Sequence, residues 1–117
     1  MRLEARKLLY DVQQAAQLVR RFTQGLSLAD YSADPMVRSA VERQLEIIGE
    51  ALGKLARFDS DLAAKVGDFR RIIAFRNLLI HGYDSVADDV VWGVVEKDVP
   101  PLLENLAGLL KQEANRP

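Results

Sequence analysis

The 117-residue chain contains no cysteine and only one histidine. Without cysteine there are no disulfides, no thiolate nucleophile and no zinc site of the finger type, as is typical of a protein in a reducing compartment. Four prolines and seven glycines are too few for a disordered chain of this length. Any acid–base chemistry that uses an imidazole must run through a single residue, His81.

Long apolar runs are also missing. No stretch approaches the roughly 20 apolar residues that span a bilayer, and the charged start at residues 1–7 is not followed by the apolar core of a signal peptide. We therefore expect a cytoplasmic protein without a membrane partner. The net charge of −1 gives no overall attraction to nucleic acid, so a basic patch has to be local. A chain of this length is expected to form one domain over residues 1–117.

Apolar residues recur at spacings of three and four, which predicts amphipathic helices. These cover residues 2–24, 35–57 and 69–81, and a fourth helix begins at about residue 86. Residues 26–33 are interpreted as a connector, Asp34-Pro35 is a strong helix start, and a short helical turn is expected over 61–66.

The segment Val90–Val95 is rich in β-branched residues, as strands are. We still predict helix, because the helical stripe continues through it and a lone strand has nothing to pair with. Pro100-Pro101 predicts a kink or a restart in this last element. Four long helices on one core predict an all-α, antiparallel up-down four-helix bundle.

Arg76 interrupts the apolar stripe of the third helix. On a helix its same-face neighbours are all apolar or aromatic: Phe69, Ile72, Ile73, Leu79, Ile80 and Tyr83. A guanidinium in such surroundings needs a carboxylate, a phosphate or a partner surface, because burying it unpaired costs several kcal/mol or more.

His81 and Tyr83 follow Arg76 closely and make it a candidate site residue. On an ideal helix Arg76 and His81 differ by about 140° in direction, so the trio converges only if the helix unwinds near Ile80, which Gly82 makes easy. Convergence would place a bidentate phosphate ligand beside a group that titrates near neutral pH. That pairing suits RNA phosphodiester cleavage and requires neither a metal nor a cofactor.

The segment Arg76-Asn77-Leu78-Leu79-Ile80-His81-Gly82-Tyr83 resembles the Arg-x4-His-x-Tyr active-site motif of the HEPN superfamily, in the form found in HepT-like toxins. The likeness extends over nearly the whole chain, through the Asp34 connector, Ile47–Ala51, Val91-Trp92 and Asp98–Pro100.

This resemblance implies a homodimer whose two motif sites face one another across a cleft. It also implies a metal-independent endoribonuclease, the toxin of a type II or type VII toxin–antitoxin pair. Arg76 and His81 would be catalytic, with Asn77 and Tyr83 in supporting or substrate-binding roles. The partner would be a nucleotidyltransferase antitoxin of the MNT type, which in this family can silence the toxin by transferring AMP to the tyrosine that matches Tyr83.

Structural roles are alternatives for each of these residues. Arg76 can pair with Glu46 or Glu50 on the second helix, where Arg43, Glu46 and Glu50 are spaced to form a surface ion-pair network. His81 can cap a helix end, Tyr83 can be an amphipathic core residue, and Asn77 can be a solvated polar position. At the level of the whole protein, the alternative is a non-catalytic helical partner of a nucleotidyltransferase that only holds nucleotide or RNA.

Overall fold

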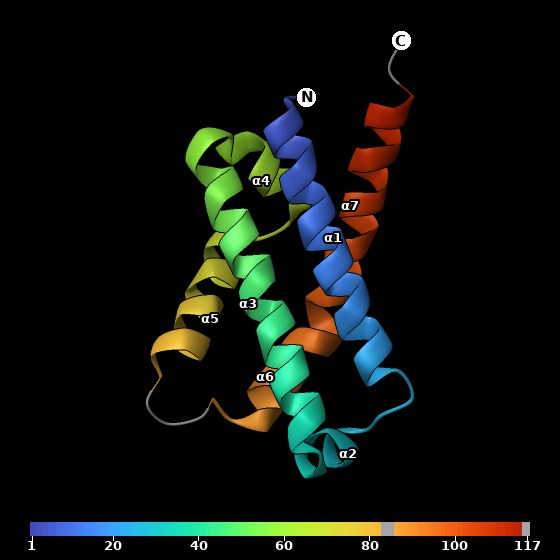
Figure 1. Cartoon of the computed structure of the whole chain (residues 1–117), viewed down its shortest axis with the longest axis vertical. Helices are drawn as coiled ribbons and strands as arrows, with labels where there is room; N and C mark the ends of the chain where they lie inside the picture. The colour runs from blue at the N-terminus through green and yellow to red at the C-terminus, as the bar shows by residue number, and fades with distance from the viewer. Residues whose placement is uncertain (83–85, 116–117) are drawn as a thin grey trace.

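The computed structural model describes residues 1–82 and 86–115. All regular secondary structure in this part of the chain is α-helix, with no strand. Four long helices run in alternating directions, and short helices lie at the two ends of the bundle (Figure 1). The predicted all-α bundle is confirmed. The described helices are α1 (Leu3–Thr23), α2 (Leu28–Ala33), α3 (Pro35–Phe58), α4 (Ser60–Val66), α5 (Phe69–His81), α6 (Asp88–Lys97) and α7 (Val99–Ala114).

Local capping signals set where α3, α4 and α5 begin. Asp34 Oδ1 accepts hydrogen bonds from the amides of Met36 at 3.1 Å and Val37 at 3.3 Å, with Pro35 in the first turn. Asp59 caps α4 and Asp68 caps α5 in the same manner. These side chains satisfy amides that have no partner inside the helix. The predicted starts of α3 and α5 are confirmed, and α4 begins one residue before the expected turn.

The predicted connector at residues 26–33 contains a helix, which is a correction to the sequence interpretation. Ser27 and Asp30 form a capping box, in which each side chain accepts a hydrogen bond from the backbone amide of the other. This box starts α2 and turns Tyr31 into the core, where its ring lies 5.3 Å from the ring of Trp92 on α6. Tertiary contact with α6 therefore stabilises a helix too short to be stable alone.

The C-terminal element is two helices, as the two prolines predict. Residues 88–97 form α6, so the β-branched segment is helical, and α7 restarts at Val99 with Pro100 and Pro101 in its first turn. Their missing amides cost nothing there, because first-turn amides have no partner within the helix.

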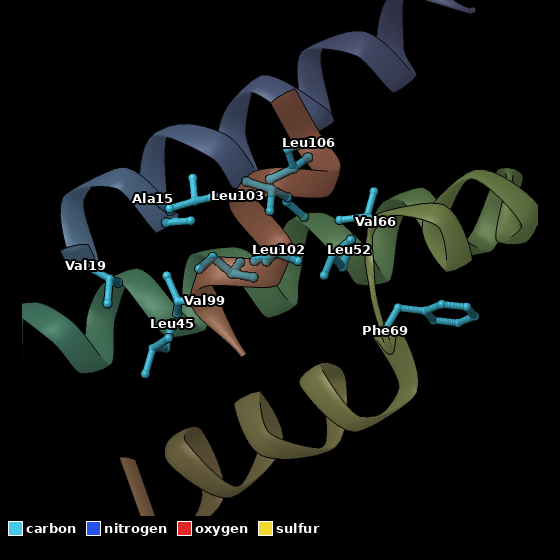
Figure 2. Close-up of a cluster of buried hydrophobic side chains, with 14 of the residues drawn as sticks. Ala15, Val19, Leu45, Leu52, Val66, Phe69, Val99, Leu102, Leu103 and Leu106 are labelled. Atoms are coloured by element: carbon cyan, nitrogen blue, oxygen red, sulfur yellow. The ribbon is translucent and has the colours of Figure 1, made fainter. Parts of the chain in front are cut away.

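The core lies where α1, α3 and α7 meet, with α4 and the start of α5 closing one end (Figure 2). On α3 the buried stripe follows the predicted spacing. On α1 the predicted Val12, Ala15 and Val19 are buried, but at the start of the helix Leu9 is fully buried while the predicted Leu8 is only partly buried. The described ranges contain no helix with the length and apolar composition that crossing a membrane requires.

Candidate functional site

Arg76 lies directly against the backbone of α3 at Gly49. A Cβ atom added at Gly49 would lie 2.3 Å from Arg76 Cβ and 2.7 Å from Arg76 Cγ, distances that real side chains do not reach. Gly49 therefore lets α5 approach α3 closely at this point. In the sequence, Gly49 is visible as a glycine inside the apolar pattern of a helix. Carboxylates of this helix were predicted as partners of Arg76, but this glycine contact was not predicted.

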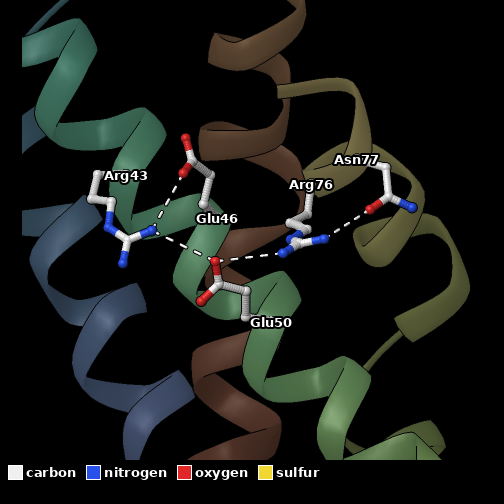
Figure 3. A network of polar contacts seen from close by, with 5 residues as sticks. All are labelled: Arg43, Glu46, Glu50, Arg76 and Asn77. Atoms are coloured by element: carbon white, nitrogen blue, oxygen red, sulfur yellow. Dashed lines mark hydrogen bonds and ion pairs between the residues drawn. The ribbon is translucent and has the colours of Figure 1, made fainter. Parts of the chain in front are cut away.

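The guanidinium of Arg76 belongs to a polar network between α3 and α5 (Figure 3). Its Nη2 lies 3.6 Å from Glu50 Oε1, and its Nη1 donates a hydrogen bond to Asn77 Oδ1 at 3.1 Å. Glu50 also lies 3.6 Å from Arg43, which in turn contacts Glu46 at 3.3 Å. The structure thus brings Arg76 and Asn77 together and selects Glu50, of the two carboxylates considered, as the ion-pair partner.

This pairing leaves Arg76 able to bind a further anion. The Glu50 contact is too long for a hydrogen bond, and both side chains are about one-third exposed, where such ion pairs contribute at most about 1 kcal/mol. Within the described residues, the buried Nε of Arg76 has no hydrogen-bond partner. The buried Nε–H is out of reach of a ligand in solution, so the Nη–H groups that Asn77 does not use are the donors available to a phosphate.

His81 does not converge on Arg76 within one chain. The helix stays regular through His81, because the Gly82 amide donates to the Leu78 carbonyl at 2.9 Å, so the unwinding near Ile80 does not occur. Arg76 and His81 are then about 7.5 Å apart along the axis and point in different directions. His81 is exposed in the last turn of α5. Tyr83 lies outside the described residues.

A groove of about 540 Å³ opens beside Arg76, between α3 and α5. Two glycines, Ala56 and Ile73 form its apolar part, and charged side chains stand along it. The complete lining is Gly49, Glu50, Gly53, Lys54, Ala56, Arg57, Ile73 and Arg76. Arg76 is therefore part of a hollow that is open to solvent, and this hollow is large enough to admit part of a polymeric ligand.

An all-helical bundle that carries Arg-x4-His in the last two turns of α5 has the architecture and motif of the HEPN class. More narrowly, the chain belongs to the HepT-like ribonuclease family, whose model, described as "Ribonuclease HepT-like", matches residues 12–108.

Several curated relatives support this assignment. A protein of Thermococcus cleftensis named "Probable ribonuclease HepT" is 34% identical over 94 residues, covering 80% of this chain and 84% of its own. A "Putative RNase" of Methanocaldococcus jannaschii is 32% identical over 101 residues, covering 85% and 90%. A second "Putative RNase", from Caldanaerobacter subterraneus subsp. tengcongensis, is 32% identical over 102 residues, covering 87% and 89%. No solved structure gives a significant match.

Proposed function

We propose that this protein is a metal-independent endoribonuclease that acts as the toxin of a type II or type VII toxin–antitoxin system. Family membership supports RNA as the substrate class. The observation that carries the proposal is Arg76, a half-buried guanidinium with unused donors at the edge of a groove, on the same helix as the exposed His81.

The proposed reaction uses the neighbouring 2′-hydroxyl as the nucleophile. Its oxygen attacks phosphorus as its proton leaves, the bond from phosphorus to the 5′-oxygen breaks, and that oxygen takes up a proton. A 2′,3′-cyclic phosphate and a 5′-hydroxyl result. His81 moves one of these protons, while Arg76 stabilises the negative charge that develops on the phosphoryl oxygens. Asn77 holds the guanidinium in place through its 3.1 Å hydrogen bond.

The test is cleavage of RNA by purified wild type, Arg76→Ala and His81→Ala in the presence of EDTA. We expect wild type to leave cyclic-phosphate ends and each variant to lose at least about 100-fold in rate, the usual contribution of a positioned proton-transfer or charge-stabilising group. Circular dichroism controls for folding. Wild-type rates in both variants would assign the activity to another site. If the wild type binds RNA without cutting it, the alternative function, a non-catalytic partner of a nucleotidyltransferase, is supported instead.

We propose a symmetric homodimer as the active form. Arg76 and His81 point apart within one copy, whereas an isologous contact brings the ends of two α5 helices to one dyad and places both sites in a shared cleft. A second copy can then complete the pair of groups that one chain keeps separate.

We propose a nucleotidyltransferase antitoxin as the partner and Tyr83 as its target. In the modification step the tyrosine oxygen attacks the α-phosphorus of ATP and releases pyrophosphate. The new phosphodiester carries negative charge two residues from His81, so it competes with RNA for Arg76.

Intact-mass measurement after co-expression with the adjacent nucleotidyltransferase tests this modification. The mass should rise by whole adenylyl units in wild type and stay unchanged in Tyr83→Phe, with toxicity lost only in wild type. If the phenylalanine variant is neutralised as fully as wild type, the antitoxin acts by covering the cleft, and tyrosine modification is not the switch.

A further inference from the structure

The groove between α3 and α5 contains positive charges that are not neutralised by the ion-pair network around Arg76. Arg43 and Arg76 are balanced by Glu46 and Glu50, so the network itself is neutral. Lys54 and Arg57 are additional, and both are exposed along the groove. Within the groove lining, three cations therefore face one carboxylate, on a chain whose formal net charge is −1.

Other hollows of the described surface lack this surplus. The largest, about 960 Å³ between α1 and the α6–α7 corner, is lined by Arg20 and Arg21 but also by Glu96 and Glu104. The apolar groove between α5 and α6 is lined by two cations, Arg71 and Lys97, and by two carboxylates, Asp89 and Asp98. Of these three hollows, the α3–α5 groove is the one with a net attraction for a polyanion.

The groove continues from Arg76 along α3, in the direction away from His81. Because α3 and α5 are antiparallel, Gly49 faces Arg76 and Gly53 faces Ile73 one turn further along. Lys54 and Arg57 therefore lie beyond Arg76, on the side away from His81. From Glu50 to Arg57 the groove follows α3 for about 10 Å.

The side chain of Arg57 is oriented along the groove by a hydrogen bond to its own helix. Its Nε donates to the Gly53 carbonyl at 3.3 Å, and no carboxylate of the described residues pairs with it. The other guanidinium donors stay available. The absence of a side chain at Gly53 leaves space in the apolar part of the groove, between Arg76 and the two exposed cations, where a ribose or a base edge can lie.

We propose that the α3–α5 groove binds the RNA strand next to the scissile phosphate, with Lys54 and Arg57 neutralising the flanking phosphates. The inference rests on the proposed ribonuclease function and adds the path of the substrate. A positively charged groove that follows the phosphate backbone is how proteins hold single-stranded RNA without sequence readout.

The experiment compares wild type, Lys54→Gln/Arg57→Gln and, as a matched control, Arg20→Gln/Arg21→Gln. Each double variant loses two exposed arginine or lysine charges beside a groove. Fluorescence anisotropy measures binding of a labelled single-stranded oligonucleotide in which every ribose carries a 2′-O-methyl group, so that cleavage cannot occur. Titrations at several salt concentrations give the slope of log K against log salt, and thermal unfolding checks that each variant is folded.

We expect the groove variant to bind about tenfold more weakly at low salt, with a salt slope shallower by about 1.4, the value for losing two phosphate contacts to a single strand. The control should match wild type. With cleavable RNA, the KM of the groove variant should rise more than its kcat falls. Equal affinities and salt slopes in the groove variant and the control would overturn the proposal. So would a groove variant that binds RNA normally but no longer binds the nucleotidyltransferase, because the groove would then be a protein interface.

Failure of the two proposals can be told apart. If wild type binds the oligonucleotide through Lys54 and Arg57 but never cleaves RNA, the groove assignment stands and the ribonuclease proposal falls. If wild type cleaves RNA and the groove variant matches it in KM and salt slope, the ribonuclease proposal stands and the groove assignment falls.

Discussion

Tyr31 is a fully buried aromatic residue whose hydroxyl finds no hydrogen-bond partner among the described residues. Burial, followed by the negative charges of Glu42 and Asp88, raises the pKa of Tyr31 above its ordinary range. The ring stabilises the fold through its contact with Trp92, whereas the hydroxyl carries a desolvation cost that no hydrogen bond to the described part of the chain offsets.

Tyr31→Phe should therefore keep or increase stability. It retains the ring and removes the unpaired polar group, so the free energy of unfolding should rise by up to about 1 kcal/mol in urea denaturation. Tyr10→Phe, at an exposed position on α1, is the control and should change little. A loss of stability in Tyr31→Phe would mean that the hydroxyl has a partner in solution, such as a bound water.

Glu42 lies near the same cluster, and its charge is disfavoured by folding. Burial, then the neighbouring carboxylates of Asp88 and Glu46, raise the pKa of Glu42, while Arg38 opposes the shift. A carboxyl whose folded-state pKa lies above its unfolded value contributes most to stability in its protonated form. That contribution is present below pH ~4.3 and is lost as pH rises through the raised pKa.

Glu42→Gln should accordingly raise Tm at pH 7 and have a smaller effect near pH 4, where the wild-type carboxyl is already largely protonated. Thermal unfolding over this pH range measures the difference, and Glu104→Gln on the exposed face of α7 is the control. An equal shift in Tm at both pH values would show that packing, and not charge, is responsible.

At the scale of the elements, the contact of α3 with α5 depends on two glycines that differ in their surroundings. Gly49 meets Arg76 with no room for a Cβ, while a Cβ at Gly53 would have Ile73 as its nearest neighbour, at 3.9 Å. The same substitution therefore has opposite expected effects one turn apart on the same helix face.

Gly49→Ala should lower the free energy of unfolding by about 1–3 kcal/mol, because the added methyl group forces α3 and α5 apart. Gly53→Ala should raise it by about 0.5–1 kcal/mol, because alanine loses less backbone entropy in a helix interior. Denaturant unfolding of both variants makes the comparison. If the two variants lose stability equally, the need for glycine at position 49 comes from backbone flexibility and not from the close contact with Arg76.

At the scale of the whole molecule, α5 is poorly covered. Among its residues only Phe69 is buried, whereas Leu78 is 58% exposed and lines one groove with Val90 of α6, which is 48% exposed. Large apolar side chains gathered at one place on a surface mark an interface more often than they mark free surface. This patch adjoins His81, which fits the proposed dimer with facing sites.

Leu78→Asp should convert a dimer into a monomer in light scattering at micromolar concentration, and RNA cleavage should fall with it. Leu3→Asp is the control, since Leu3 is 70% exposed in the first turn of α1, where an acidic side chain is favourable. A stable monomer in wild type, or an unchanged dimer in Leu78→Asp, would remove the shared cleft from this face.

The sequence by itself determined the four long helices, the caps of α3 and α5 and the unusual position of Arg76. These features depend on apolar spacing and on side chains that bond to amides within three residues, so they can be predicted without knowing how helices pack. Tertiary structure alone decided the rest: that Glu50 and not Glu46 contacts Arg76, that Gly49 seats the arginine, and that Tyr31 enters the core from a segment interpreted as a connector. It also decided that Lys54 and Arg57 line one groove with Arg76. Such pairings join residues far apart in the chain, and they are set by where the helices cross and how closely their backbones approach, which periodicity does not specify.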